Sequence, residues 1–288
     1  MNKSFIFYTL ATLSLMACSS SDDEQQGTPP AKRPLTVVVN ETPFMDENGN
    51  AQVSMRQGTR GTVITTETLE QFNMSYDKNI YTVKKSTSTG KWDTELDTWP
   101  VDYDKSISFY AYNAGTYTPN ENSLSFTVPE NASTQTDLLV AETTTSYNAH
   151  QGQVNLTFNH ACAAVDFKLR ISDLLAETHN TLTITDITLK NVANEGDYYY
   201  NNDNGGWRDV KGTGTYTLND AEMSLTKEPK ATTCGTLFMI PQTLGDAAVL
   251  SFKYGGVEKT ISLMGAKWEK GTQYVMDIVI GKKTLGLE

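Results

Sequence analysis

The residue best placed for covalent chemistry is Cys18. It closes a short apolar run, residues 5–15, that follows the cation Lys3, and Leu-Met-Ala stands directly before it. A cation, a short apolar stretch and a small residue before a cysteine are typical of a lipobox, where the secretory signal is cut and the sulfur is acylated, for example with palmitate. The sequence predicts a signal peptide over residues 1–17 and a lipid on Cys18. The alternative is an ordinary signal peptide with an incidental cysteine.

The two other cysteines, Cys162 and Cys234, both lie in apolar, strand-like stretches. Disulfides form in exported proteins, so these two thiols could pair and join two sheets. Cysteine is also among the most buried residue types, and each thiol could be a small hydrophobic side chain of a core. The sequence leaves both interpretations open.

Catalytic and metal chemistry find little support. His150, His160 and His179 are separated by ten and nineteen residues, with no second ligand at metal spacing. Residues 46–50 resemble the start of a calcium loop but lack its glycine at the sixth position and its acid at the twelfth. None of the 34 acidic residues stands in a diagnostic motif. We therefore expect no enzyme activity, metal or cofactor, and interpret His160 as a structural side chain near a strand bend.

Charge excludes one class of partner. The net charge is −11, from 23 basic and 34 acidic residues, and no run is rich in lysine or arginine. Nothing concentrates positive potential for a phosphate backbone, so we expect no nucleic-acid partner. The segment 18–34 is rich in serine, proline and charge and cannot bury enough apolar surface to offset its ordering. We expect a flexible tether there, and its opening, residues 19–24, resembles a surface-export tag of bacterial lipoproteins.

Aromatic side chains around a predicted turn are candidates for ligand binding. Tyr198, Tyr199, Tyr200 and Trp207 flank residues 201–206, which are rich in asparagine and glycine. Exposed rings at Tyr199 and Trp207 could stack on the faces of sugars. The alternative is packing within a sheet, because tyrosine favours strands and three consecutive tyrosines must point to both faces of one.

The elements that carry these residues are almost all predicted strands. Apolar and polar residues alternate over 165–171, and a change of phase near Asp186 indicates a β-bulge. Residues 249–254 and 257–263 flank Gly255-Gly256 and predict a tight hairpin. Many short strands without intervening helices predict an all-β protein. We expect two antiparallel β-sandwich domains after the lipidated tether, at 35–150 and 151–288, divided within a polar stretch.

Five sequence segments, in this order along the chain, resemble characteristic motifs of the fimbrillin family, the Mfa-like or type V pilins. They are residues 99–100, 106–113, 156–161, 239–244 and 268–274. The resemblance implies transthyretin-like, Greek-key β-sandwiches in a fimbrial (pilus) subunit or a fimbria-associated cell adhesion lipoprotein. It also implies a place in the fimbrium or on the cell outer membrane, exposed at the surface. Other fimbrial subunits would be partners, and host or bacterial glycans or proteins would be candidate ligands.

The same resemblance implies proteolytic processing. Precursors in the family are cut after an arginine near the start of the first domain, and the groove left by the lost strand accepts a strand from a neighbour. Here Leu35, Val37 and Val39 belong to an apolar, β-branched run that can form this first strand. Downstream, Arg60 lies between glycines at 58 and 61 in a loop open to proteases. We expect cleavage at Arg60, or else at Arg56, unless both are uncut, as in anchor subunits.

Two functions of different classes therefore stay open. The first is a fimbrial or adhesion subunit that assembles by donated strands, and the second is a monomeric, glycan-binding surface lipoprotein of similar build. Eight residues follow the last candidate strand, 273–280. Either that strand is itself donated to a neighbouring subunit, or this subunit caps the fibre. The sequence does not distinguish stalk, tip and anchor roles.

Overall fold

Strand β6 (Ile107–Tyr112) illustrates why these residues form sheets. Ile107, Phe109 and Ala111 are buried, whereas Ser108 and Tyr110 between them are partly exposed. The same period of two recurs along neighbouring strands, because one face of each strand lies on a core while the other meets solvent or a second layer. Alternation in the sequence thus becomes an inner and an outer face.

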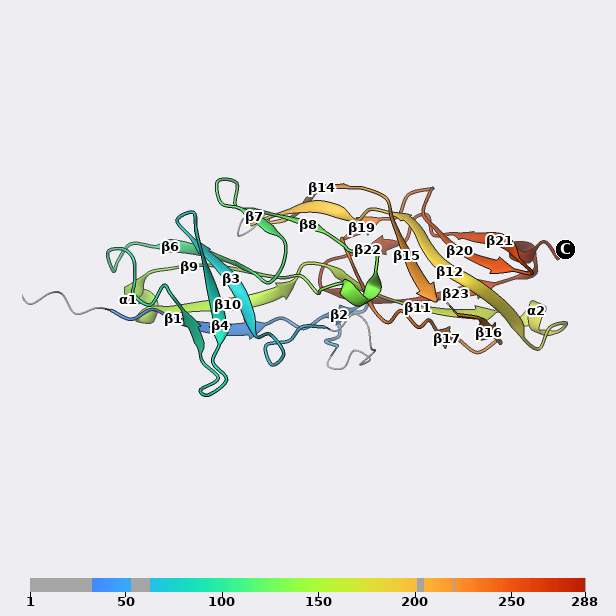
Figure 1. Cartoon of the computed structure of the whole chain (residues 1–288), viewed down its shortest axis with the longest axis horizontal. Helices are drawn as coiled ribbons and strands as arrows, with labels where there is room; N and C mark the ends of the chain where they lie inside the picture. Colours follow the sequence, from blue (N-terminus) through green and yellow to red (C-terminus); the bar gives the residue numbers. More distant parts are fainter. Residues whose placement is uncertain (1–32, 53–62, 201–204, 220, 288) are drawn as a thin grey trace, which may run out of the picture. The chain divides into compact units, whose positions relative to one another are not determined.

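The computed structural model describes residues 33–52, 63–200, 205–219 and 221–287, all within one compact unit (Figure 1). The predicted signal peptide, Cys18 and nearly all of the tether lie outside the described residues, as do Arg56 and Arg60. Lipidation and cleavage therefore stay predictions. Among the described residues, no helix has the length and apolar character needed to cross a membrane.

The first core lies inside a closed barrel. Its strands follow the order β1-β10-β9-β6-β3-β4-β5. Besides β6, they are β1 (Thr36–Glu41), β10 (Gln153–His160), β9 (Leu139–Thr145), β3 (Gln71–Tyr76), β4 (Asn79–Lys85) and β5 (Trp92–Thr94).

The second core is enclosed by several sheets. One contains β17 (Lys230–Ala231), β11 (Ala163–Ile171), β23 (Thr272–Ile280), β2 (Met45–Asp46) and β18 (Leu237–Met239). Another contains β15 (Gly214–Asn219), β12 (Leu182–Val192), β20 (Val249–Tyr254), β21 (Val257–Ser262) and β16 (Met223–Leu225). The remaining strands are β14 (Gly206–Lys211), β13 (Glu195–Tyr199), β8 (Ser123–Thr127) and β7 (Thr116–Thr118) in one sheet, and β19 (Gln242–Thr243) with β22 (Lys267–Trp268).

Helical structure is limited to single turns in the described part of the chain. These turns are η1 (Ala132–Thr134), α1 (Tyr147–His150), α2 (Asp173–Ala176) and α3 (Lys282–Leu285). The predicted all-β class is confirmed. The hairpin across Gly255-Gly256 is also confirmed as β20–β21, and the predicted bulge appears as a register shift beside Asp186, whose φ is 52°.

Within the described residues three strand pairs are parallel, which the antiparallel prediction did not anticipate. They are β1 with β10, β11 with β23, and β2 with β23. Parallel neighbours need long connections, and these pairs join strands that lie far apart in the sequence. Strand β1 is thereby inserted beside β10, and β23 is inserted beside β11.

The change of sheet does not coincide with the predicted division at 150/151. The polar stretch there forms the α1 turn, capped by the Ser146 hydroxyl and closed by Gln151 in the left-handed region. The chain then continues into β10, which remains in the barrel. It passes to the second core after His160, and β8 from the first half pairs with β13 from the second.

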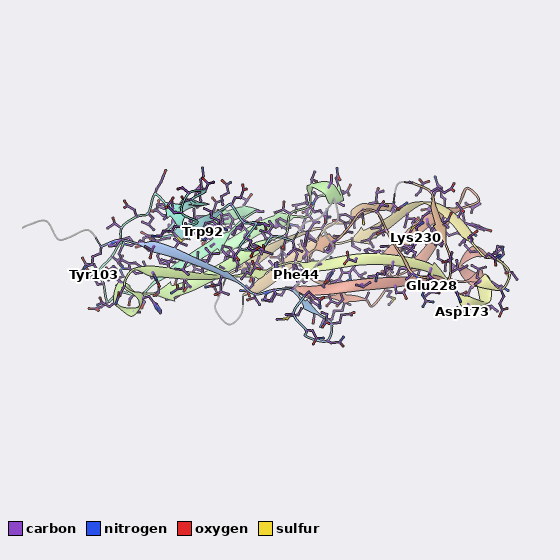
Figure 2. All side chains as sticks on the ribbon, turned by 90° about the horizontal axis from the view of Figure 1, so that it is seen from below. Phe44, Trp92, Tyr103, Asp173, Glu228 and Lys230 are labelled. Atoms are coloured by element: carbon purple, nitrogen blue, oxygen red, sulfur yellow. The ribbon has the colours of Figure 1, made fainter. Side chains whose placement is uncertain are left out.

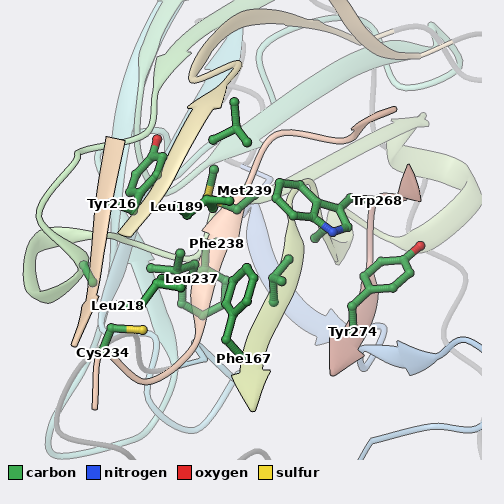
Figure 3. Close-up of a cluster of buried hydrophobic side chains, with 14 of the residues drawn as sticks. Phe167, Leu189, Tyr216, Leu218, Cys234, Leu237, Phe238, Met239, Trp268 and Tyr274 are labelled. Atoms are coloured by element: carbon green, nitrogen blue, oxygen red, sulfur yellow. The ribbon is translucent and has the colours of Figure 1, made fainter. Parts of the chain in front are cut away.

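The second core is built largely from aromatic and aliphatic side chains of β11, β12, β15 and β18. Figure 3 shows Phe238 and Met239 of β18 among Phe167, Leu189 and Tyr216, all of them buried. This core lies directly beyond the end of β10.

Candidate functional site

Strand β1 takes a place in the barrel between β10 and β5. It pairs in parallel with β10 along its whole length and meets β5 opposite Trp92. Leu35 and Val37 are 6% and 7% exposed, and Val39 packs partly buried against the same core. This run forms strand β1, and its role as the removable first strand of a donor-strand groove stays a prediction.

Contacts of Arg33 hold the start of this strand in place. Its Cζ atom lies 3.1 Å from the centroid of the Tyr103 ring and 5.2 Å from that of Tyr147, which are cation–π contacts. The Arg33 carbonyl accepts a 3.0 Å hydrogen bond from the Trp99 backbone N–H. Sequence reasoning missed this contact, because nothing local to Arg33 indicates a partner seventy residues away.

Phe44 continues the same segment into the second core. Figure 2 labels it where the chain passes from β1 toward β2. Its side chain is 2% exposed. The centroid of its ring lies 3.8 Å from that of the His160 imidazole and 6.3 Å from that of the Phe238 ring. Residues 33–52 therefore contribute side chains to both cores.

The imidazole beneath Phe44 is held by a buried carboxylate. His160 Nδ1 lies 2.9 Å from Asp137 Oδ2, and both side chains are almost wholly buried. The Ile64 backbone N–H donates to the same oxygen at 3.2 Å. The interpretation of His160 as a structural side chain agrees with this geometry, although the sequence did not identify Asp137 or Phe44 as its neighbours.

No disulfide joins Cys162 and Cys234, and both side chains are buried. Burial, reinforced by the charge of Asp137, raises the pKa of the Cys162 thiol well above its usual range. The Cys234 thiol donates to the carbonyl of Gly235 at 3.2 Å. The structure therefore agrees with the second interpretation, in which both cysteines are small hydrophobic side chains of a core, here the second core.

Tyr199 and Trp207 do not form a shared stacking platform. In the β13–β14 register Trp207 lies opposite Tyr198, and its indole N–H donates to the Ala161 carbonyl at 2.6 Å. Tyr199 points to the other face, where the Arg208 guanidinium lies 4.6 Å from its ring centroid. Side chains alternate across a strand, so the two candidate rings lie on opposite faces.

The neighbouring tyrosines pack inward. Tyr198 and Tyr200 are buried, and the Tyr200 hydroxyl donates to the Ala111 carbonyl at 2.9 Å. Burial, with a smaller contribution from Glu142, raises the pKa of Tyr198 to about 12. The packing alternative for this tyrosine run therefore describes two of its three residues.

The Asp46 turn uses its carboxylate internally. Oδ1 accepts hydrogen bonds from the backbone N–H groups of Asn48 and Asn50 at 2.9 and 2.8 Å. Hydrogen bonds from Asn50, first from its side chain and then from its backbone, lower the pKa of Asp46. In the described part of the chain, no group of three or more His, Cys, Asp or Glu side chains could hold a metal ion.

Solved structures with a similar fold come from Bacteroides. One is a candidate cell adhesion protein from Bacteroides uniformis, with a TM-score of 0.52 and 15% identity over 89% of this chain and 95% of that one. Another, from Bacteroides ovatus, has a TM-score of 0.51 and 14% identity over 88% and 94% of the two chains. At such identities the likeness concerns the fold. The comparison with curated proteins finds no match.

A family model gives the more direct assignment. The model described as fimbrillin-like matches residues 37–287, which is nearly the whole described chain. The match begins within β1 and ends two residues after α3, so it includes both cores. The chain belongs to the fimbrillin-like family, and this membership supports a fimbrial or cell-adhesion role.

Proposed function

We propose that the protein is a fimbrial subunit or fimbria-associated adhesion lipoprotein that assembles by strand donation after loss of its N-terminal strand. The observation that carries this proposal is the position of β1. It lies between two barrel strands, it comes from the extreme start of the described chain, and it stands upstream of the predicted cleavage loop at 56–60.

Loss of β1 would open a slot in the barrel. Backbone donors and acceptors along β10 would lose their partners, and the pockets filled by Leu35 and Val37 would be exposed. Each such side chain contributes roughly 1.5–3 kcal/mol when buried. A strand from another subunit would restore both the hydrogen bonds and the apolar contacts, which is the logic of β-strand addition.

The C-terminal strand is an unsuitable donor for this slot. Strand β23 pairs in parallel with β11 over eight residues, from Ala164 to Ile171. Its inward residues Ile278 and Ile280 are buried in the second core. Withdrawing β23 would dismantle that core, so we propose that this chain acts as the acceptor and that another segment supplies the strand.

The order of sites along the chain couples release to activation. Cys18, the proposed lipid site, precedes β1, and Arg60 follows β1. A cut after Arg60 would break the covalent link between the folded part and its outer-membrane anchor, and loss of β1 from the barrel would then complete the release. Before the cut, the lipid would hold an inactive precursor at the membrane.

The test is to map the N-terminus of the protein on cells and in released fibres by mass spectrometry. We expect Gly61 at the N-terminus of assembled protein and ladders that resist mild denaturant. The double variant Arg56→Ala/Arg60→Ala should keep its N-terminus at Cys18 and form no ladder. The matched control is Lys91→Ala, an exposed basic residue of another turn, which should assemble normally.

An N-terminus at Cys18 in every fraction of the unaltered protein would overturn the cleavage step. Ladders formed equally well by the double variant would show that assembly needs no removal of β1.

A further inference from the structure

The pocket that holds Phe44 is shaped for a planar ring. Phe44 and His160 stack with an interplanar angle of 22° and a centroid separation of 3.8 Å, and Phe238 closes another side. Offset stacking of this kind favours an aromatic ring over an aliphatic side chain of similar volume. We call the space occupied by the Phe44 ring, bounded by His160 and Phe238, the Phe44 pocket.

The walls of the Phe44 pocket do not depend on the segment that fills it. His160 and Phe238 both lie downstream of residue 60, and Asp137, which orients the imidazole, does as well. Ile64, whose N–H donates to Asp137, also lies after the predicted cut. The pocket would therefore keep its shape once residues up to Arg60 had left, and a preorganised pocket binds at lower entropic cost.

Backbone hydrogen bonds on both sides fix where a ring must be placed. The Thr42 N–H donates to the Phe158 carbonyl at 2.8 Å, at the end of the barrel. The Met45 N–H donates to the Gly271 carbonyl at 2.9 Å, at the start of β23. The ring thus stands five residues after Val39, the last residue of β1 that packs against the hydrophobic core of the barrel.

The two parts of the slot differ in selectivity. In the barrel, Leu35 and Val37 fill positions that any strand with alternating aliphatic residues could fill. The Phe44 pocket adds a second requirement, an aromatic ring at one fixed distance from these two positions. A strand with the right alternation but no ring at that distance would leave His160 and Phe238 uncovered.

We propose that the Phe44 pocket is the selective subsite of the acceptor groove. It takes an aromatic side chain from an extended segment of another subunit, five residues beyond that segment's last barrel-facing residue. This inference rests on the proposed function, since it concerns which strand the groove accepts.

The test uses the full chain with a site-specific protease sequence inserted between Arg60 and Gly61. Cutting this sequence gives a nicked protein whether or not natural processing occurs. Fluorescent peptides that copy residues 33–52 are then added in excess, and their uptake is measured. The peptides carry the natural sequence, Phe44→Ala, Phe44→Leu or, as the matched control, Val38→Ala on the half-buried side of the strand.

We expect the Phe44→Ala peptide to bind on the order of a hundredfold more weakly than the natural peptide, because it leaves the ring pocket empty. The Phe44→Leu peptide should fall between these two, about tenfold weaker, because it keeps apolar contact but not stacking. The Val38→Ala peptide should bind nearly as well as the natural one.

Equal uptake of the natural, Phe44→Ala and Phe44→Leu peptides would overturn the selective role while leaving strand donation intact. Failure of every peptide, the natural one included, would instead overturn the proposed strand exchange and this inference with it.

Discussion

At the scale of single residues, the buried pair of His160 and Asp137 joins segments far apart in sequence. His160 ends β10, Asp137 precedes β9, Ile64 donates to the carboxylate and Phe44 covers the imidazole. The other carboxylate oxygen, Oδ1, has no hydrogen-bond partner among the described residues. A buried carboxylate that has so few donors depends heavily on each of them.

Replacing His160 with alanine should therefore lower the free energy of unfolding by about 3–5 kcal/mol, because it leaves Asp137 buried without its main partner. Asp137→Asn should cost less, since an amide retains an oxygen acceptor and carries no charge. Urea denaturation at neutral pH measures both. Lys267→Ala, which removes an exposed ion pair with Glu269, serves as control and should have no measurable effect. A His160→Ala loss as small as this control would contradict the argument.

At the scale of elements, the approach of β1 to β10 depends on one glycine. Gly152 precedes β10 with a φ of +82°, and its carbonyl accepts a 3.0 Å hydrogen bond from the Thr36 N–H. A Cβ atom there would lie 2.3 Å from the Pro34 carbonyl oxygen and 2.8 Å from the Tyr147 ring. Both the backbone conformation and the close approach require glycine at this position.

Gly152→Ala should destabilise the chain by about 2 kcal/mol or more, since left-handed strain adds to a backbone clash. The start of β1 must move away, so proteolytic loss of the N-terminal segment should also accelerate. Denaturant unfolding and timed proteolysis measure the two effects. Gly245→Ala is the control, because its Cβ would meet nothing within 4 Å, and its stability should be unchanged. Equal behaviour of the two variants would show that β1 can adjust freely.

Strands were predictable where their signal is local. The alternation over 165–171 became β11, and the glycine pair at 255–256 became a hairpin, because period and turn chemistry act over a few residues. The parallel insertion of β1 beside β10 has no such local signal. The polar stretch before β10 forms a capped turn, and its composition alone does not distinguish such a turn from a linker.

The candidate site was predictable only in part for the same reason. Leu35, Val37 and Val39 follow from their own alternation. Arg33 with Tyr103, and Phe44 with His160, are contacts between residues seventy or more positions apart. One sequence alone offers no means of pairing such residues before the fold is known.

At the scale of the whole described chain, residues 33–52 serve both cores at once. Leu35 and Val37 complete the barrel, whereas Phe44 and the short strand β2 complete the second core. An acceptor groove limited to the barrel would involve only β10 and β5. A groove that includes the Phe44 pocket extends to the start of β23 and gives the incoming strand a longer surface to match.

This difference is measurable by hydrogen exchange. We expect removal of the N-terminal segment from the nicked chain to accelerate exchange in β10 and β5 and also around Gly271 and Thr272, which contact β2. Protection in β12, β20 and β21 should persist, because these strands have no pairing with the segment. The intact chain, measured in parallel, gives the reference. Acceleration confined to the barrel would limit the groove to β1, and loss of protection in every sheet would mean that the segment sustains the entire fold.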